Sequence, residues 1–537
     1  MPQPADIIFT HAKVFTADPT HSWAEAVAVR GRQIVYVGNQ AEAMQAWRGT
    51  STRLIDAQGC TLMPGFIDSH FHLWWGSLEL DDIPLNGVHA FEQLAEAVRQ
   101  FASANPNNPW LIGQGLIYNV GPGRQPLTRH QLDSLVADRP LILFAYDSHT
   151  AWANTEALRQ AKLLLHGQTI APNSEIVLGP DGLANGELRE PGAYEPVRQL
   201  IPPLSASRKR ALLRQGLALA ARYGVTSVHN MDGREGQITL YRALEEAGEL
   251  TLRIYAPYDV TPETTPETLA EAVAVRQAYR SDMLRGGCVK FFMDGVIESY
   301  TGLLLDDYAG QPGCRGGANY STERFTCLAT EADRLGLQIF VHAVGDGAVR
   351  RSLDGFEAAQ KANGRRDNRH RIEHIELIHP DDTPRFAELA VIASMQPAHA
   401  PLPAQTHDVW PARVGEARWE HSFAWQTLRT AGARLVFGSD WPVATQNPLE
   451  GVYAALNRRP WAAGQPQQRQ TLADTLLAYT HEAAYAEFQE EKKGQLRAGM
   501  LADLVLLSAD IFATPPEEIN QVQPVLTMCD GRIVYEG

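Results

Sequence analysis

The middle of the chain alternates between short apolar runs and longer amphipathic stretches. Eight runs are predicted to be strands: Met63 to His72, Thr226 to Met231, Leu252 to Ala256, Val289 to Asp294, Leu337 to His342, His370 to His374, Val391 to Gln396 and Leu435 to Asp440. Several are apolar at consecutive positions, which is typical of parallel strands buried on both faces. A helix is expected over Arg208 to Tyr223, with Ser205 or Ser207 as its N-cap and Gly224 at its end. Eight strands with intervening helices predict an α/β fold, a (β/α)8 TIM barrel, with functional residues at the C-terminal strand ends.

The two ends of the chain alternate apolar and polar residues with the period of a half-buried sheet. Strands are expected around an Arg30-Gly31 turn near the N-terminus and around an Asp530-Gly531 turn near the C-terminus. Each half-sheet has a face to bury, so we expect one composite β-sandwich of residues 1–61 and 492–537. The barrel domain then spans residues 62–491. The segment 73–204 is too long for a loop after the first strand, and we expect it to be an inserted subdomain over the barrel mouth.

The composition is that of an ordinary globular protein. Of the 537 residues, 44% are hydrophobic and 20% are charged. The net charge of -15 is spread along the chain without a basic stripe, which argues against nucleic acid as a partner. No apolar run reaches the roughly 20 residues that span a bilayer, and residues 1–6 lack a signal-peptide pattern, so we expect no membrane partner and a cytoplasmic location. The five scattered cysteines indicate neither a disulfide framework nor a thiolate zinc site.

Metal-ligating residue types stand at the ends of the expected strands. His70 and His72 close the first strand, and residues two apart on a strand point to one face, so both imidazoles can reach one cation. Strands four, five, six and eight carry four further candidates: Lys290, His342, His374 and Asp440. A single barrel histidine is more often structural than a ligand. Agreement across five strands is improbable by chance and predicts a metal site.

Lys290 lies in an apolar strand, where a charged amine is costly to bury. A neutral amine can take up carbon dioxide and become a carbamate, an anionic oxygen ligand able to bridge two cations. In the alternative interpretation, an unmodified Lys290 pairs with an acidic neighbour such as Asp294, and the site is mononuclear. The sequence leaves both open.

Together these motifs resemble those of the binuclear amidohydrolase superfamily over essentially the whole chain. The subgroup that contains N-substituted formamide deformylase is similar in the segments 64–72 (PGFIDSHFH), 341–346 (VHAVGD), 394–399 (SMQPAH), 438–440 (GSD) and 499–505 (GMLADLV). The resemblance implies that His70, His72 and Asp440 bind the more buried ion. His342 and His374 would bind the more exposed one, with a carboxylated Lys290 as the bridge.

The implied cofactor is Zn(II), two ions per chain, with Mn, Fe or Co as other occupants of such a site. In this mechanism a metal-activated water attacks the substrate, and Asp440 is the catalytic residue that moves the water's proton to the leaving nitrogen. The implied function is hydrolysis of a carbon–nitrogen bond, amide or N-formyl, in a small non-peptide substrate. An esterase, lactonase or cyclic-imide hydrolase on the same site is an alternative, because activated water does not choose the leaving group.

A third class, a non-catalytic scaffold protein, is disfavoured by the intact ligand set. The resemblance also implies a homodimer as one expected state, because members of this superfamily are commonly dimers. The expected partner in the reaction is a small-molecule substrate. Four further side chains are expected near the pocket: His399 after strand seven, His149 in the insertion, and Trp74 and Trp441 beside the ligand segments, which would suit an apolar substrate group. His229, at the end of strand two, has no implied role.

Overall fold

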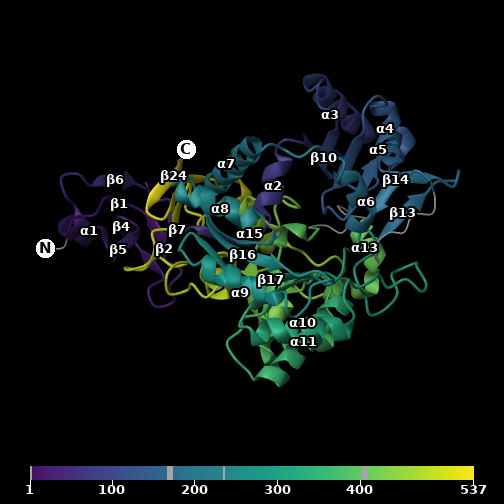
Figure 1. Cartoon of the computed structure of the whole chain (residues 1–537). Helices are drawn as coiled ribbons and strands as arrows, with labels where there is room; N and C mark the ends of the chain where they lie inside the picture. Colours follow the sequence, from purple (N-terminus) through teal and green to yellow (C-terminus); the bar gives the residue numbers. More distant parts are fainter. Residues whose placement is uncertain (1–2, 166–172, 234–235, 402–408) are drawn as a thin grey trace.

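A barrel of eight parallel strands forms the centre of the computed structural model, which describes residues 3–165, 173–233, 236–401 and 409–537 (Figure 1). The strand order is β21-β20-β19-β18-β17-β16-β15-β8. The strands are β8 (Phe66–Phe71), β15 (Val225–Asn230), β16 (Arg253–Asp259), β17 (Leu284–Phe292), β18 (Gln338–Ala343), β19 (Arg371–His374), β20 (Ile392–Met395) and β21 (Arg434–Phe437). Backbone hydrogen bonds close the ring just beyond β21, where the Asp440 amide donates to the His70 carbonyl at 2.7 Å and the His72 amide to the Trp441 carbonyl at 2.9 Å. The predicted fold class is confirmed.

Helices follow the barrel strands, and most of them lie on the outside of the barrel (Figure 1). They are α7 (Ala206–Arg222), α8 (Gln237–Glu246), α9 (Leu269–Ala278), α10 (Thr322–Arg334), α11 (Asp346–Asn363), α12 (Arg385–Glu388), α13 (Val409–Val414), α14 (Trp425–Thr430), α15 (Pro448–Asn457), α16 (Leu472–Ala478) and α17 (His481–Ala486). In α7 the Ser205 hydroxyl accepts from the Arg208 amide, and Gly224 follows with a φ of 78°. Serine caps the free amides at a helix start and glycine tolerates a positive φ, so sequence and structure agree on this helix. Within the described ranges, no helix combines the length and apolarity that crossing a bilayer requires.

The expected first strand, Met63 to His72, is divided in the structure. Its first part is β7 (Thr61–Pro64), which pairs with β2 and β22 in a sheet outside the barrel, and only β8 lines the barrel. Gly65 lies between them because a Cβ there would fall 2.3 Å from the Thr226 side chain. His72 therefore lies one residue beyond the strand, as the N-cap of α2 (Leu73–Glu79).

Both chain ends contribute to the sheets beside the barrel. The strands are β1 (Ile7–Thr10), β2 (Lys13–Phe15), β3 (Trp23–Ala24), β4 (Ala26–Arg30), β5 (Gln33–Gly38), β6 (Arg53–Asp56), β7, β22 (Leu504–Leu507), β23 (Pro524–Cys529) and β24 (Arg532–Glu536), with helix α1 (Gln40–Trp47). One sheet has the order β5-β4-β1-β6, and the other has the order β24-β23-β22-β7-β2-β3. Phe9, Val27, Leu62 and Leu504 are buried in one cluster drawn from both sheets. The two predicted turns are present, with positive φ at Gly31, Asp530 and Gly531.

The segment after β8 builds a sheet of its own, with the order β13-β14-β12-β11-β10-β9. Its elements are β9 (Ile83–Pro84), α3 (Phe91–Ala104), β10 (Leu111–Leu116), α4 (Arg129–Leu135), β11 (Leu141–Ala145), β12 (Thr150–Ala153), α5 (Thr155–Gln160), β13 (Glu175–Leu178), β14 (Ala184–Arg189) and α6 (Pro191–Arg198). The sheet has a separate apolar cluster on each face. Figure 1 shows this unit on the side of the barrel opposite the terminal sheets.

Candidate metal centre

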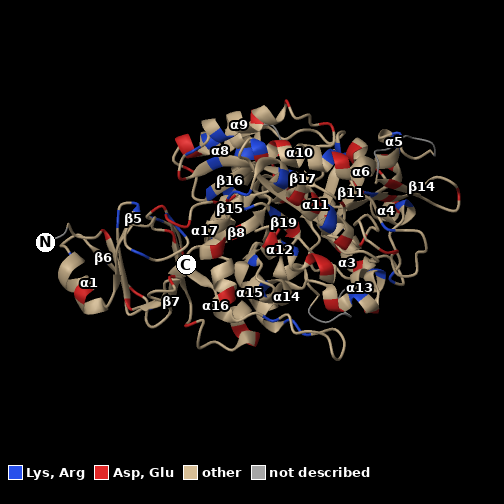
Figure 2. Cartoon of the chain, turned by 90° about the horizontal axis from the view of Figure 1, so that it is seen from below, with Lys and Arg blue, Asp and Glu red and all other residues tan. Residues whose placement is uncertain are grey.

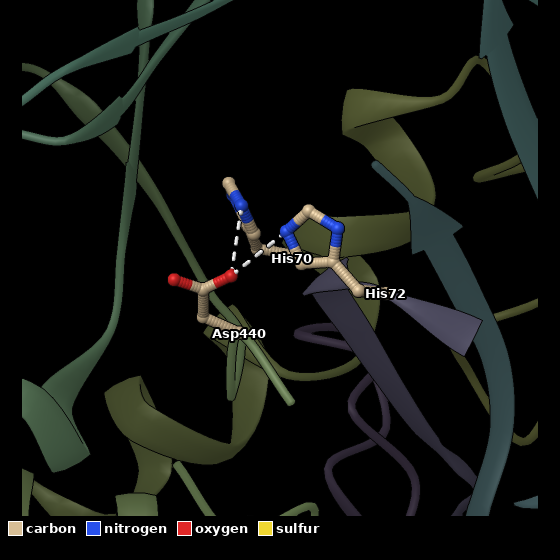
Figure 3. A group of neighbouring side chains, drawn as sticks. All are labelled: His70, His72 and Asp440. Atoms are coloured by element: carbon tan, nitrogen blue, oxygen red, sulfur yellow. Dashed lines mark ion pairs between the residues drawn. The ribbon is translucent and has the colours of Figure 1, made fainter. Parts of the chain in front are cut away.

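Two histidines and one aspartate meet where β8 and β21 end. Asp440 Oδ1 lies 3.2 Å from His70 Nε2 and 3.1 Å from His72 Nε2 (Figure 3). All three side chains are buried, with at most 8% of each exposed. Asp440 has a φ of 59°, a left-handed backbone conformation that aspartate tolerates better than most residues. One carboxylate oxygen between two ring nitrogens is the geometry of a cation site built from N and O ligands.

Carboxylates behind the two histidines orient their rings. His70 Nδ1 lies 2.7 Å from Glu373 Oε2, and His72 Nδ1 lies 2.7 Å from Asp232 Oδ1. A carboxylate at Nδ1 accepts the ring proton and leaves the Nε2 lone pair directed at the centre. Burial lowers the pKa of His72, but Asp232 and Asp440 outweigh it and raise this pKa to about 9. A cation bound at Nε2 would displace that second proton.

A second group of ligand atoms shares Asp440. His374, at the end of β19, and His399, after β20, place ring nitrogens 3.8 Å from Asp440 Oδ2. His374 Nδ1 also lies 2.9 Å from Gln396 Oε1, which leaves Nε2 without a hydrogen-bond partner among the described residues. Burial lowers the pKa of His374 well below its usual value, so the ring is neutral, the form that binds metal ions.

Lys290 and His342 complete the cluster from β17 and β18. The His342 ring lies 4.4 Å from that of His374, centroid to centroid, and its Nε2 lies 3.2 Å from the Gly295 carbonyl oxygen. Lys290 is 1% exposed, and in the described part of the chain its Nζ has no hydrogen-bond partner. Burial lowers the pKa of Lys290 to about 8, although Glu373 and Asp440 act to raise it.

Asp294, the alternative partner of Lys290, forms hydrogen bonds with other groups. Asp294 accepts hydrogen bonds from the backbone amides of Leu303, Val344 and Gly345 at 2.8 to 3.0 Å. The buried polar atoms at the centre that lack a hydrogen-bond partner within the described ranges include Lys290 Nζ, His374 Nε2, His399 Nε2 and Asp440 Oδ1. Four such atoms in one place are costly unless a cation binds them, so the donor set fits a metal centre.

Of the other side chains expected near the pocket, His149 and Trp441 lie beside the cluster, whereas Trp74 does not. The His149 ring lies 5.5 Å from that of His342, and its Nδ1 lies 2.8 Å from Glu190 Oε2. Trp441 is 7% exposed, and its ring lies 5.0 Å from that of Phe71, the residue between the two histidines. Trp74 lies outside the barrel against α7, where the Lys209 ammonium is 5.6 Å from its ring, whereas the neighbouring Trp75 ring is 5.0 Å from that of His72.

His229 lies inside the barrel below the centre. Its Nδ1 is 2.6 Å from an Arg371 guanidinium nitrogen and its Nε2 is 3.3 Å from Glu487 Oε1. Sequence reasoning missed the carboxylates that contact the histidines: Glu373, Asp232, Glu190 and Glu376. Asp232 could have been found because it stands two residues after the end of β15.

Comparisons with known proteins identify the family of the chain. The chain matches the model of the amidohydrolase family over residues 53–535. It is 31% identical to Protein LONG AFTER FAR-RED 3 of Arabidopsis thaliana, over 99% of this chain and 92% of that protein. It is 27% identical to N-substituted formamide deformylase of Arthrobacter pascens, over 100% of this chain and 99% of that protein. An uncharacterized metal-dependent hydrolase from Pyrococcus furiosus superposes with a TM-score of 0.72 at 26% identity, over 95% of this chain and 99% of that one. The barrel fold, the cluster of ligand atoms and these matches lead to one conclusion: this chain belongs to the amidohydrolase family of metal-dependent hydrolases.

Proposed function

We propose that this protein hydrolyses the carbon–nitrogen bond of a small, non-peptide amide or N-formyl compound. The observation that carries the proposal is the buried cluster of Asp440 with His70, His72 and His374, in which Asp440 Oδ1 and His374 Nε2 have no hydrogen-bond partner in the described chain. Support for the bond type comes from the similarity to N-substituted formamide deformylase over the full length of both chains.

The ligand roles are those that the family resemblance implies, and the contacts of Asp440 with His70, His72 and His374 support them. His70, His72 and Asp440 would hold one ion, and His342 and His374 a second. Lys290 would join the two after its neutral amine forms an N–C bond to carbon dioxide and releases one proton to solvent. Zinc, or Mn, Fe or Co in its place, would supply a water molecule that is deprotonated near neutral pH and would polarise the substrate carbonyl.

Asp440 is placed to move the proton. Its Oδ1 faces the histidine pair, while its Oδ2 faces His374 and His399 on the other side. Burial raises the pKa of Asp440, but His70 and His72 outweigh it and hold the pKa well below its usual value. An ionised Asp440 can accept a proton from the attacking water and then donate it to the leaving nitrogen, which an amide requires more than an ester does.

The insertion contacts the barrel beside this site. Tyr146, just after β11, donates a hydrogen bond of 2.7 Å to Glu298 Oε1 on the barrel side. His149 directly precedes β12, and its ring lies beside that of His342. Both contacts hold the inserted unit over the C-terminal ends of the strands, where barrel enzymes bind their substrates.

The test combines metal analysis with a substrate panel. We expect about two metal equivalents per purified chain, as in two-metal hydrolases. A mass increase of one carbon dioxide on the peptide that contains Lys290 would support the bridge. N-substituted formamides should be cleaved faster than N-acyl amino acids, aryl esters or lactones. A metal-replete protein that hydrolyses only the esters or lactones would contradict the proposed bond type, and a protein that retains no metal would contradict the proposal as a whole.

A further inference from the structure

A second cavity opens at the opposite end of the barrel from the metal centre. It has a volume of about 570 Å³ and lies between the start of β17, the start of β18 and the segment after α9. Arg285, near the start of β17, forms part of its wall, and Lys290 follows five residues later on the same strand. At about 3.3 Å per residue, the two lie about 16 Å apart along the strand. The cavity is therefore separate from the catalytic site.

Four arginines and a single aspartate provide the charges of the cavity wall: Arg276, Arg280, Arg285, Arg366 and Asp367. Arg369 contacts Asp367 at 2.9 Å and Glu490 at 2.8 Å, so it compensates the charge of Asp367 in part. Figure 2 shows Lys and Arg residues beside α9, β16 and β17 at this end of the molecule. The cavity is thus positive in character.

The arginines are only partly compensated by protein carboxylates. Arg366 pairs with Asp333 at 2.8 Å, and Arg285 reaches Glu487 at 3.4 Å. Arg276 donates instead to the backbone carbonyls of residues 335 and 336. Arg280 has no ion pair among the described residues. Two guanidinium groups therefore line the cavity without a carboxylate of their own, and the planar N–H fork of arginine matches the oxygens of a carboxylate or phosphate.

The dimensions indicate an organic ligand instead of a bare ion. Pockets of roughly 300 to 1,000 Å³ are those that enclose small organic molecules. Tyr279 and the partly exposed Phe488 add aromatic surface to the wall, and the glycines at 286, 287 and 336 leave the floor without side chains. A ring with an attached oxyanion would meet apolar surface and guanidinium groups at once.

We propose that this cavity is a binding site for a small organic anion, a carboxylate or phosphate ester, at the N-terminal end of the barrel. Arg276 and Arg280, the two without a carboxylate partner among the described residues, would bind the oxyanion, and Tyr279 and Phe488 would contact the organic part. The proposal is independent of the reaction at the metal centre, since binding can be measured without turnover.

Titration calorimetry on the full chain tests it with phenyl phosphate as the probe and benzyl alcohol as its uncharged counterpart. We expect saturable binding of phenyl phosphate and none of benzyl alcohol. Arg280→Gln should weaken binding about tenfold or more, because a hydrogen bond to a charged group is removed. Arg159→Gln removes an equally long and charged side chain from α5 of the insertion and should leave the Kd unchanged.

Benzoate in place of phenyl phosphate tests whether the site prefers a carboxylate or a phosphate ester. Binding of either compound supports the proposed site. Circular dichroism of each variant shows that its fold is intact. The proposal is overturned if the wild-type chain binds neither anion, or if Arg280→Gln binds them as tightly as the wild type does, since the anion would then be held at the metal centre.

Discussion

At the scale of single residues, Asp440 is distinguished by facing ligand atoms on both of its carboxylate oxygens. Asp440→Asn keeps the shape and one oxygen ligand but removes the group that accepts and returns a proton. We expect amide turnover to fall by about 10²- to 10⁴-fold, the usual contribution of a positioned acid or base, while most of the metal is retained. Steady-state kinetics and metal analysis on the same preparation check this. Turnover at the wild-type rate would remove Asp440 from the proton transfer.

Asp232 acts through His72, so its effect should appear in metal affinity. Asp232→Asn replaces the carboxylate that fixes the His72 tautomer, and we expect metal affinity to fall about 10- to 100-fold. Competition with a chromophoric chelator measures it.

The matched control for both aspartate variants is Asp56→Asn. Asp56 contacts His11 Nδ1 at 3.0 Å in the same manner, but the pair lies on the exposed face of the terminal sheets. Its removal should change neither metal affinity nor turnover. A wild-type metal affinity in Asp232→Asn would show that His72 is oriented by other contacts.

The ligand residues could be predicted from sequence because their order along successive strands constrains them. Glu373, the carboxylate partner of His70, could not. Glu373 and His374 are neighbours on β19, and alternation would direct them to opposite faces. His374 has a φ of 73°, so the backbone leaves the extended conformation there, and both side chains reach the inside of the barrel. A local backbone irregularity of this kind leaves no periodic signal.

At the scale of elements, one buried ion pair joins the barrel to the terminal sheets. Arg253 of β16 is 2% exposed and contacts Asp503 beside β22 at 2.6 Å and Asp530 of the β23–β24 turn at 2.8 Å. Arg253→Ala leaves Asp503 buried without a counter-charge, and breaking such a pair costs about 3–5 kcal/mol. We expect a clear fall in Tm by calorimetry.

Arg208→Ala is the control for this variant, because Arg208 and Asp81 form an exposed pair whose loss costs at most about 1 kcal/mol. Equal Tm values for the two variants would show that the barrel and the terminal sheets are held together by their apolar contacts. The sequence predicted both units but not the division of the first strand at Gly65, because apolar residues continue through Met63 and Phe66 and no polar position marks the change of sheet.

At the scale of the whole molecule, a chain of charged and polar side chains runs through the barrel from the second cavity to the metal centre. Successive contacts of 3.4, 3.3, 2.6, 2.6 and 2.7 Å join Arg285, Glu487, His229, Arg371, Glu373 and His70. Every member from Glu487 to His70 is at most 2% exposed. Glu487 also contacts Lys493 at 2.5 Å. Low local dielectric strengthens each of these interactions, so a change of charge at one end alters the electrostatic interactions of the next member.

This chain predicts different effects for two arginines of the same cavity. Without Arg285, Glu487 interacts more strongly with His229 Nε2, which makes His229 Nδ1 a better acceptor for Arg371 and so changes, through Arg371 and Glu373, the orientation of His70. Arg285→Gln should therefore lower metal affinity by about 2- to 30-fold, the range found for coupling between distant sites. Arg280→Gln, in the same wall but outside the chain of contacts, should leave metal affinity at the wild-type value. Chelator competition on both variants measures this difference. Equal metal affinities of Arg285→Gln and Arg280→Gln would mean that the buried contacts support the barrel without linking its two ends.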